Sequence, residues 1–144
     1  MRYSPKFLPL PVMSSLSSLG QKHSDVLYFL FRALVGFMFM SHGMQKVGLL
    51  EGTFAAEGLM GFIGVCELLG GLAVMVGFFT RLASLLAAIL MILAYFKMHA
   101  SQGLLPLNNG GEPALLYAVS FLVIFVHGAQ KWSLEKSLLK RETF

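Results

Sequence analysis

Four long stretches of the chain are almost continuously apolar, and short polar segments separate them. They cover residues 26–44, 58–79, 82–98 and 113–129. About 20 apolar residues in a helix cross the roughly 30 Å hydrocarbon layer of a bilayer. A helix also pairs its own backbone N–H and C=O groups, which lipid cannot do. The stretches do not alternate as the strands of a membrane barrel would. The pattern therefore predicts an all-α integral membrane protein, a four-transmembrane-helix bundle.

The connections divide the chain further. Only Thr80 and Arg81 separate the second and third stretches, which predicts a tight antiparallel hairpin. The segment LLPLNNGGEP before the fourth stretch is rich in turn-forming residues. We expect an N-terminal tail at 1–22 that is mobile or lies at the interface, a membrane domain at 23–132, and a basic cytoplasmic tail at 133–144. The sequence leaves open whether Met1 or Met13 is the true start.

Lysine and arginine counts predict the orientation. With four spans, the N-terminus, the second turn and the C-terminus lie on one side, with three, one and four basic residues, a sum of eight. The opposite side carries two, Lys46 and Lys97. Basic residues concentrate in the cytoplasmic loops of membrane proteins. Both termini are therefore predicted to be cytoplasmic, in a multi-pass membrane protein.

Composition supports a lipid environment. The 144 residues are 56% hydrophobic and 12% charged, against about 25% charged in a typical soluble domain. The same numbers exclude a disordered chain. A single cysteine, Cys66, excludes a disulfide within one chain. The pI of about 9.4 does not indicate nucleic-acid binding, because the basic residues form no stripe or reading motif. The expected surroundings are the lipid bilayer.

Two charged residues, Arg32 and Glu67, lie well inside predicted spans. A charge at the bilayer centre costs at least about 2.5–3.5 kcal/mol on insertion scales, so each needs a reason. Both belong to stripes of small residues that favour close helix packing, with Gly36 and Gly43 in the first span and Gly64 and Gly71 in the second. One interpretation is a buried Arg32–Glu67 pair that fixes helix register. The other is a site for a proton-coupled reaction or a small polar head group.

Other polar residues gather near the predicted outer ends of the helices. With Glu67 as its floor and Arg32 on the cytoplasmic side, the expected intramembrane polar cluster contains Arg32, Lys46, Glu67, His99, Asn109 and Glu112. Glu67 and His42 are the candidate catalytic residues, because carboxylates and imidazoles can carry protons. His42, His99 and Glu112 could form a metal site, but no HxxxH or CxxC pair appears, so no metal is predicted.

The chain resembles the DoxX family of small four-helix bacterial membrane proteins over roughly 27–138. The resemblance rests on RALVGFMFMSHGMQK from Arg32, ELLGGLAVMVGFFTR from Glu67 and NGGEPALLY from Asn109. The closing HGAQKWSLE departs from the family pattern at Gln130 and Glu135. The family takes its name from a subunit of a quinol oxidase and thiosulfate:quinone oxidoreductase system. Other members are linked to thiol and oxidative-stress responses. The resemblance thus implies a subunit associated with an oxidoreductase, in the bacterial plasma membrane.

Three functions follow as hypotheses. The first is a redox-associated subunit that acts with a quinone or thiol partner, with Glu67 and His42 managing protons. The second is a non-enzymatic assembly protein whose basic tail docks partners. The third is a small-solute carrier, which would act as a homo-oligomer. Quinone is the one cofactor considered, because the chain has no haem, flavin, nucleotide or iron–sulfur motif. Electrons would therefore need a redox partner protein.

Overall fold

A computed structural model describes residues 11–50 and 56–141, and within these ranges the chain is helical and forms no β-strand. This confirms the predicted all-α class. The elements in chain order are α1 (Pro11–Lys46), α2 (Gly58–Val76), α3 (Thr80–Ala94), the π-helical η1 (Tyr95–His99), the 3-10 η2 (Ala100–Gln102), α4 (Pro106–Asn109), α5 (Glu112–His127) and α6 (Leu134–Leu139).

Three helical stretches are long and apolar enough to cross a membrane. They are Ser17–Lys46, Gly58–Val76 and Thr80–Gln102. Together they make the chain a multi-pass membrane protein. The apolar α5 has 16 residues, which at 1.5 Å per residue gives it a length of about 24 Å. The fourth span and the cytoplasmic side of the termini stay predictions.

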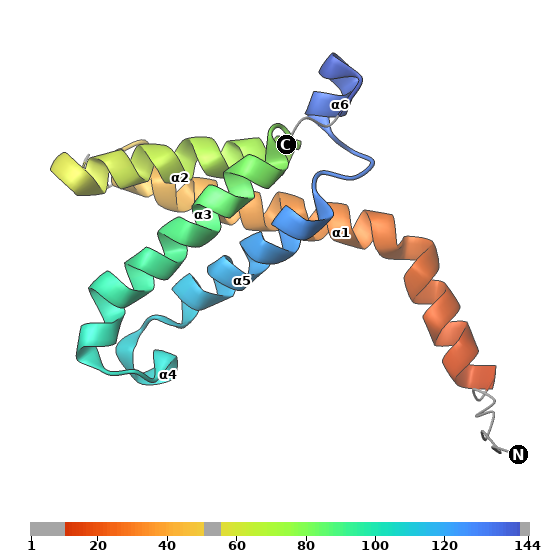
Figure 1. Cartoon of the computed structure of the whole chain (residues 1–144), viewed down its shortest axis with the longest axis horizontal. Helices are drawn as coiled ribbons and strands as arrows, with labels where there is room; N and C mark the ends of the chain where they lie inside the picture. The colour runs from red at the N-terminus through yellow and green to blue at the C-terminus, as the bar shows by residue number, and fades with distance from the viewer. Residues whose placement is uncertain (1–10, 51–55, 142–144) are drawn as a thin grey trace, which may run out of the picture.

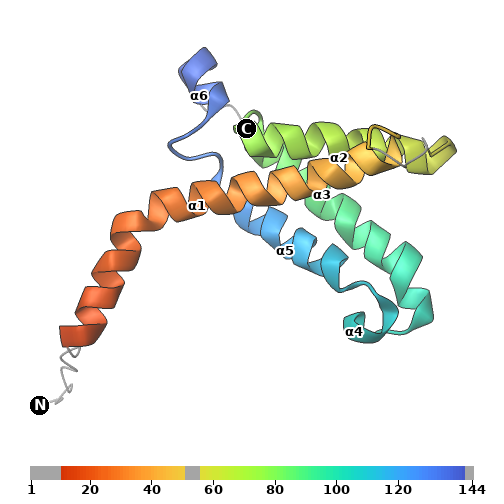
Figure 2. The same ribbon diagram turned by 180° about the vertical axis from the view of Figure 1, so that it is seen from behind.

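The helices form two antiparallel hairpins (Figures 1 and 2). Helix α1 packs along α2, and α3 packs along α5. The hairpins meet near the turn between α2 and α3. From there they diverge towards the start of α2 and towards α4. Contacts between the hairpins are consequently fewer than contacts within each one.

Glycines bring α1 and α2 close together. A Cβ atom added at Gly36 would lie 2.6 Å from the backbone nitrogen of Met75. One added at Gly71 would meet the backbone of Met40 just as closely. Small residues allow such close approach in lipid, where apolar side chains gain little by leaving the bilayer. The predicted small-residue stripes of the first two spans are thus confirmed as their packing interface.

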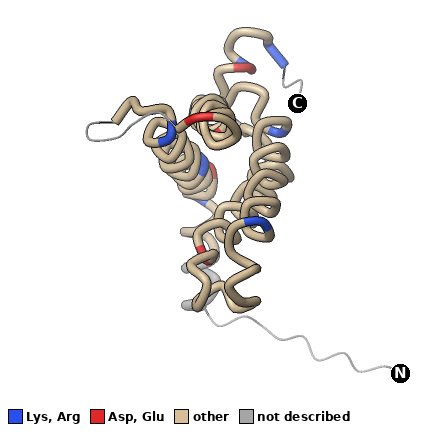
Figure 3. The backbone as a smooth tube through the Cα atoms, turned by 90° about the vertical axis from the view of Figure 1, so that its left-hand side faces the viewer, with Lys and Arg blue, Asp and Glu red and all other residues tan. Residues whose placement is uncertain are grey.

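The buried core is small, and most of the surface is apolar. The residues at its centre are Phe39, Val74, Ala88, Phe121 and Ile124. Large side chains elsewhere on the helices are exposed, as in Phe62 at 67% and Val126 at 67%. Such exposure is unfavourable in water but matches the hydrocarbon of a bilayer. Charged residues are correspondingly sparse along the helices (Figure 3).

The C-terminal segment packs onto the turn between α2 and α3. Gly77 and Phe79 take positive φ angles there, 77° and 45°. The Ser133 hydroxyl donates to the Gly77 carbonyl at 2.9 Å, and the Phe79 N–H donates to the Glu135 carboxylate at 3.1 Å. Residues 133–135 were predicted as the start of a separate tail. They instead pack against the α2–α3 turn, at the end of the molecule where the two hairpins meet.

The described N-terminal part is helical. Helix α1 begins at Pro11, inside the range predicted as tail, and residues 1–10 lie outside the described residues. Its first turns bend away from the bundle (Figure 1). Asp25 forms an ion pair with Lys131 at 2.6 Å, which ties this helix to the segment before α6.

Candidate functional site

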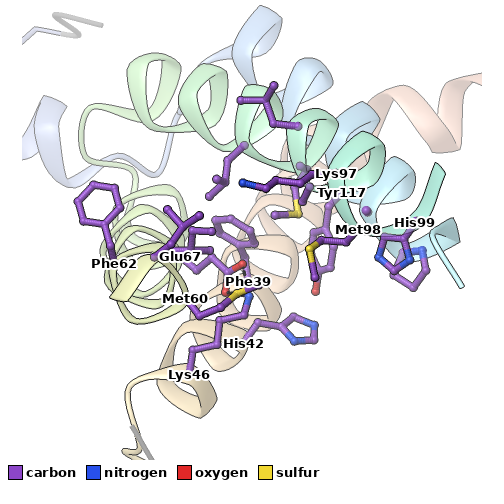
Figure 4. Close-up of a pocket in the computed structure, with 18 of the residues that line it drawn as sticks. Phe39, His42, Lys46, Met60, Phe62, Glu67, Lys97, Met98, His99 and Tyr117 are labelled. Atoms are coloured by element: carbon purple, nitrogen blue, oxygen red, sulfur yellow. Dashed lines mark hydrogen bonds and ion pairs between the residues drawn. The ribbon is translucent and has the colours of Figure 1, made fainter. Parts of the chain in front are cut away.

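A cavity of about 680 Å³ lies between the two hairpins, where they diverge (Figure 4). Small-molecule sites have volumes of about 300–1,000 Å³ and mostly apolar walls. This cavity also has mostly apolar walls. Its polar lining residues come from α1, α2, α5 and the segments η1 and η2: His42, Lys46, Glu67, Lys97, His99, Gln102 and Tyr117.

An ion pair forms one wall of the cavity. The Lys46 ammonium donates to both carboxylate oxygens of Glu67, at 2.5 and 2.6 Å. Glu67 is 2% exposed, whereas the side chain of Lys46 is 32% exposed. Lysine therefore compensates a carboxylate that the helix holds inside the membrane, and the lysine keeps one side open to the cavity. Ionisable groups at such depth typically mark sites of binding or proton transfer.

The predicted Arg32–Glu67 pair is wrong. Arg32 is fully buried and donates to the carbonyls of Val74 at 2.5 Å and Trp132 at 2.6 Å. The first of these carbonyls belongs to the last turn of α2, where carbonyls lack helical partners and attract cations.

The register of the antiparallel α1–α2 hairpin explains why Glu67 pairs with Lys46 and not with Arg32. Gly36 lies opposite Met75, and Gly43 lies opposite Leu68. One turn before Gly36, the chain is therefore level with the C-terminal end of α2. One turn after Gly43, Lys46 packs against Gly64 on α2, and its side chain extends one turn along α2 to Glu67. Arg32 lies at the C-terminal end of α2, away from Glu67 in the middle of that helix.

Tyr117 is a cavity residue that the sequence analysis missed. Its ring contacts those of Phe39, His42 and Phe121, with centroids 5.7, 5.8 and 6.0 Å away. The sequence does hold a signal for it, because a tyrosine within an apolar span needs a partner for its hydroxyl group. His42, a candidate catalytic residue, is exposed beside this ring.

The π-helical segment η1 brings an ammonium group and an imidazole to the cavity rim. Lys97 and His99 both belong to it and both line the cavity. The Nδ1 atom of His99 lies 3.0 Å from the carbonyl oxygen of Asn109. Asn109 is 5% exposed, and its amide donates to the Gly103 carbonyl at 2.6 Å. Asn109 thus shapes the loop that holds His99 and does not itself line the cavity.

The other residues of the predicted polar cluster do not line the cavity. Glu112 is exposed in the first turn of α5 and is not part of the lining. Within residues 11–50 and 56–141, no three His, Cys, Asp or Glu side chains are arranged to hold a metal ion. Of the predicted cluster, the structure brings together Lys46, Glu67 and His99, with His42 beside them. Arg32, Asn109 and Glu112 lie elsewhere.

The edge of the cavity is apolar and reaches the lipid-facing surface. Leu59 and Phe62 on α2, and Leu93 on α3, line it and are 56%, 67% and 60% exposed. A molecule with an apolar tail could therefore enter sideways from the bilayer. The arrangement suits a lipid-soluble ligand whose small polar head reaches the Lys46–Glu67 pair.

Comparison with known proteins adds a family match. A model described as DoxX matches residues 27–100. An uncharacterized protein of Haemophilus influenzae is 36% identical over 127 residues, which cover 79% of this chain and 93% of that protein. A second uncharacterized protein of the same organism is 33% identical over 75 residues, 52% of this chain and 49% of that protein. No solved structure matches the chain significantly.

Proposed function

The chain belongs to the DoxX family, and from this we propose that it is a membrane subunit of quinone-linked redox chemistry. In this proposal a lipid-soluble quinone binds in the cavity between the two hairpins. Its ring lies against the Lys46–Glu67 pair, and its apolar tail leaves towards the bilayer between α2 and α3.

The buried ion pair on the wall of a mostly apolar cavity is the observation that carries this proposal. A quinone combines a compact head bearing two carbonyl oxygens with a long apolar tail. The Lys46 ammonium offers its remaining N–H donor to the head. The apolar residues along α2 and α3 match the tail. A cavity of about 680 Å³ has room for a ring and part of a tail.

Protons have candidate carriers at the same place. A quinone takes up two protons with two electrons when it becomes a quinol. Glu67 and His42 both line the cavity, and both side chains can exchange a proton. In this proposal the exposed His42 takes up protons from water, and Glu67 relays them to the quinone. A redox partner protein supplies the two electrons. A thiol-bearing partner is one form that this protein could take.

The proposal includes a topology. Helix α5 serves as a fourth span, and both termini lie in the cytoplasm of a bacterial cell, because eight basic residues face that side against two. The cavity then faces the outer leaflet. The carrier hypothesis placed Arg32 and Glu67 at mid-membrane, and Arg32 instead bonds to the carbonyls of Val74 and Trp132. No specific contact favours the assembly hypothesis.

Mass spectrometry of the gently purified protein tests the proposed function. We expect quinone to co-purify at close to one molecule per chain and to be lost in Glu67→Gln. Glu112→Gln, which alters an exposed carboxylate outside the cavity, is the matched control and should retain it. Quinone at no more than its proportion in the surrounding lipid would refute the proposal. Equal quinone in wild type and Glu67→Gln would refute the site.

A further inference from the structure

We propose that the hydroxyl group of Tyr117 donates a hydrogen bond to a carbonyl oxygen of the bound quinone, and that the cavity binds the oxidised quinone more tightly than the quinol. This inference rests on the proposed function and deepens it. It assigns a recognition residue and the redox form of the ligand.

The hydroxyl of Tyr117 is buried, and no group in the described part of the chain lies within hydrogen-bonding distance of it. Leaving a buried donor without a partner costs free energy, and such groups in folded proteins need an explanation. Tyr117 belongs to the cavity wall. A ligand oxygen that settles against this wall, with a small adjustment of the side chains around it, supplies the missing partner.

Two other tyrosines of the membrane domain differ from Tyr117. The Tyr28 hydroxyl donates to the Gly128 carbonyl at 2.6 Å. The Tyr95 hydroxyl donates to the Leu104 carbonyl at 2.9 Å. Both phenols therefore have structural roles at the ends of the bundle. Tyr117 lies between them on the cavity wall, and its hydroxyl has no such role.

Neighbouring rings restrict how Tyr117 can respond. Phe121 stacks on it at an interplanar angle of 21°, and His42 meets it edge-on at 84°. Phe39 packs against a third side. With its ring held in this way, the hydroxyl cannot turn far to find a backbone carbonyl. It stays preorganised for a partner that enters the cavity, which reduces the ordering cost of binding.

At the cavity wall, Tyr117 and the Lys46–Glu67 pair together provide more free donors than free acceptors. Lysine has three N–H donors, and the two bonds to Glu67 leave Lys46 one for the cavity. Tyr117 offers another. Both oxygens of Glu67 already accept from Lys46, which weakens them as acceptors for a new donor. A quinone head only accepts hydrogen bonds, whereas a quinol head must also donate two. The oxidised form is therefore the better complement.

The test measures the affinity of wild type, Tyr117→Phe and Tyr28→Phe for a benzoquinone with a decyl tail and for its quinol, in nanodiscs of one defined lipid without oxygen. We expect wild type to bind the quinone at least about tenfold more tightly than the quinol. Tyr117→Phe should lose about fivefold to tenfold in quinone affinity, the value of one hydrogen bond, and much of the preference. Tyr28→Phe should keep both.

Thermal unfolding separates recognition from a structural role. Without ligand, Tyr117→Phe should be as stable as wild type or more stable, because it removes a buried donor without a partner. Tyr28→Phe should be less stable, because it loses a bond to a carbonyl. A less stable ligand-free Tyr117→Phe would make the hydroxyl structural and overturn the inference.

The binding outcomes also distinguish the two proposals. Saturable quinone binding with an unchanged affinity in Tyr117→Phe, or with quinol bound equally well by wild type, overturns this inference and leaves the proposed function standing. Saturable binding of neither form by wild type overturns both. The comparison of the two redox forms in wild type needs no variant, so it remains decisive if Tyr117→Phe fails to fold.

Discussion

Lys46 determines what Glu67 can do. A carboxylate that is 2% exposed in a membrane helix is stable as an ion only when a cation compensates it. Lys46 does so from the last turn of α1, and its partial exposure leaves it accessible to a ligand. The pair is thus both a structural contact and the polar part of the cavity. These two roles can be separated by mutation.

The pair should show strong energetic coupling. Removing one partner of a buried pair costs about 3–5 kcal/mol, because the other charge is left uncompensated. We expect Lys46→Met to fall at the lower end of this range, since Lys46 is partly exposed. The double variant Lys46→Met/Glu67→Leu should be more stable than Lys46→Met alone. Thermal unfolding of all variants in one detergent measures this. Additive effects would contradict the coupling.

Arg32 should affect stability without affecting the site. Arg32→Ala removes hydrogen bonds to the Val74 and Trp132 carbonyls, and bonds to charged groups contribute about 1.5–3 kcal/mol each. We expect a marked fall in the unfolding temperature, while quinone per folded molecule stays at the wild-type level. Cys66→Ala, at a half-buried position, should change neither quantity by much. Loss of quinone from folded Arg32→Ala would contradict this separation.

The sequence shows which residues need a compensating partner, but it does not show which residue that partner is. The cost of intramembrane charge correctly singled out Arg32 and Glu67 as residues that need compensation. It could not choose their partners, because the choice depends on the register of two helices joined by a loop of unknown shape. Tyr117 escaped notice for a related reason. Whether a hydroxyl group has a hydrogen-bond partner depends on all its neighbours in space, and the sequence alone does not specify these neighbours.

Among the elements, the hairpin of α1 and α2 depends on glycine. Gly36 and Gly71 face the backbone of the opposite helix at distances that no side chain can occupy. The sequence predicted this interface, because small residues recur on one stripe of each span, a local pattern that requires no knowledge of register. The shape of the connection from α3 to α5 was harder to predict from the sequence. Its π-helical turn and the role of Asn109 arise from contacts within the loop.

Adding one carbon at this interface should be costly. In Gly36→Ala the new Cβ would lie 2.6 Å from the backbone nitrogen of Met75, and overpacking of this kind costs about 1–3 kcal/mol. We expect a lower unfolding temperature and weaker quinone retention, since a shift between the helices moves Lys46 relative to Glu67. Gly20→Ala is the matched control, because a Cβ there meets nothing within 4 Å. An equal effect of both substitutions would show that helix propensity, and not close packing, governs the response.

In the whole molecule, the end where the hairpins meet at the α2–α3 turn and the end where they diverge have different functions. Ser133 and Glu135 hold the turn between α2 and α3, and Arg32 reaches the same junction through Trp132. The cavity lies towards the opposite end, where the hairpins diverge. A fixed junction at one end sets the distance between α2 and α3 at the other. The C-terminal segment is therefore expected to influence a cavity that it does not touch.

Weakening the contact between the C-terminal segment and the α2–α3 turn should broaden the distribution of distances across the cavity opening. Ser133→Ala removes the hydroxyl that donates to Gly77 and accepts from the N–H of Lys136. Spin labels at Leu59→Cys and Met98→Cys, in a Cys66→Ala background, report the distance across the opening in a pulsed electron–electron measurement. We expect a broader distance distribution in Ser133→Ala than in the parent, and a several-fold loss of quinone affinity with Lys46 and Glu67 unchanged. Ser137→Ala is the control, because that hydroxyl donates to the Ser133 carbonyl within its own helix turn. An unaltered distribution in Ser133→Ala would mean that the contacts between α2 and α3 alone set the opening. The segment after α5 would then serve only to terminate the bundle.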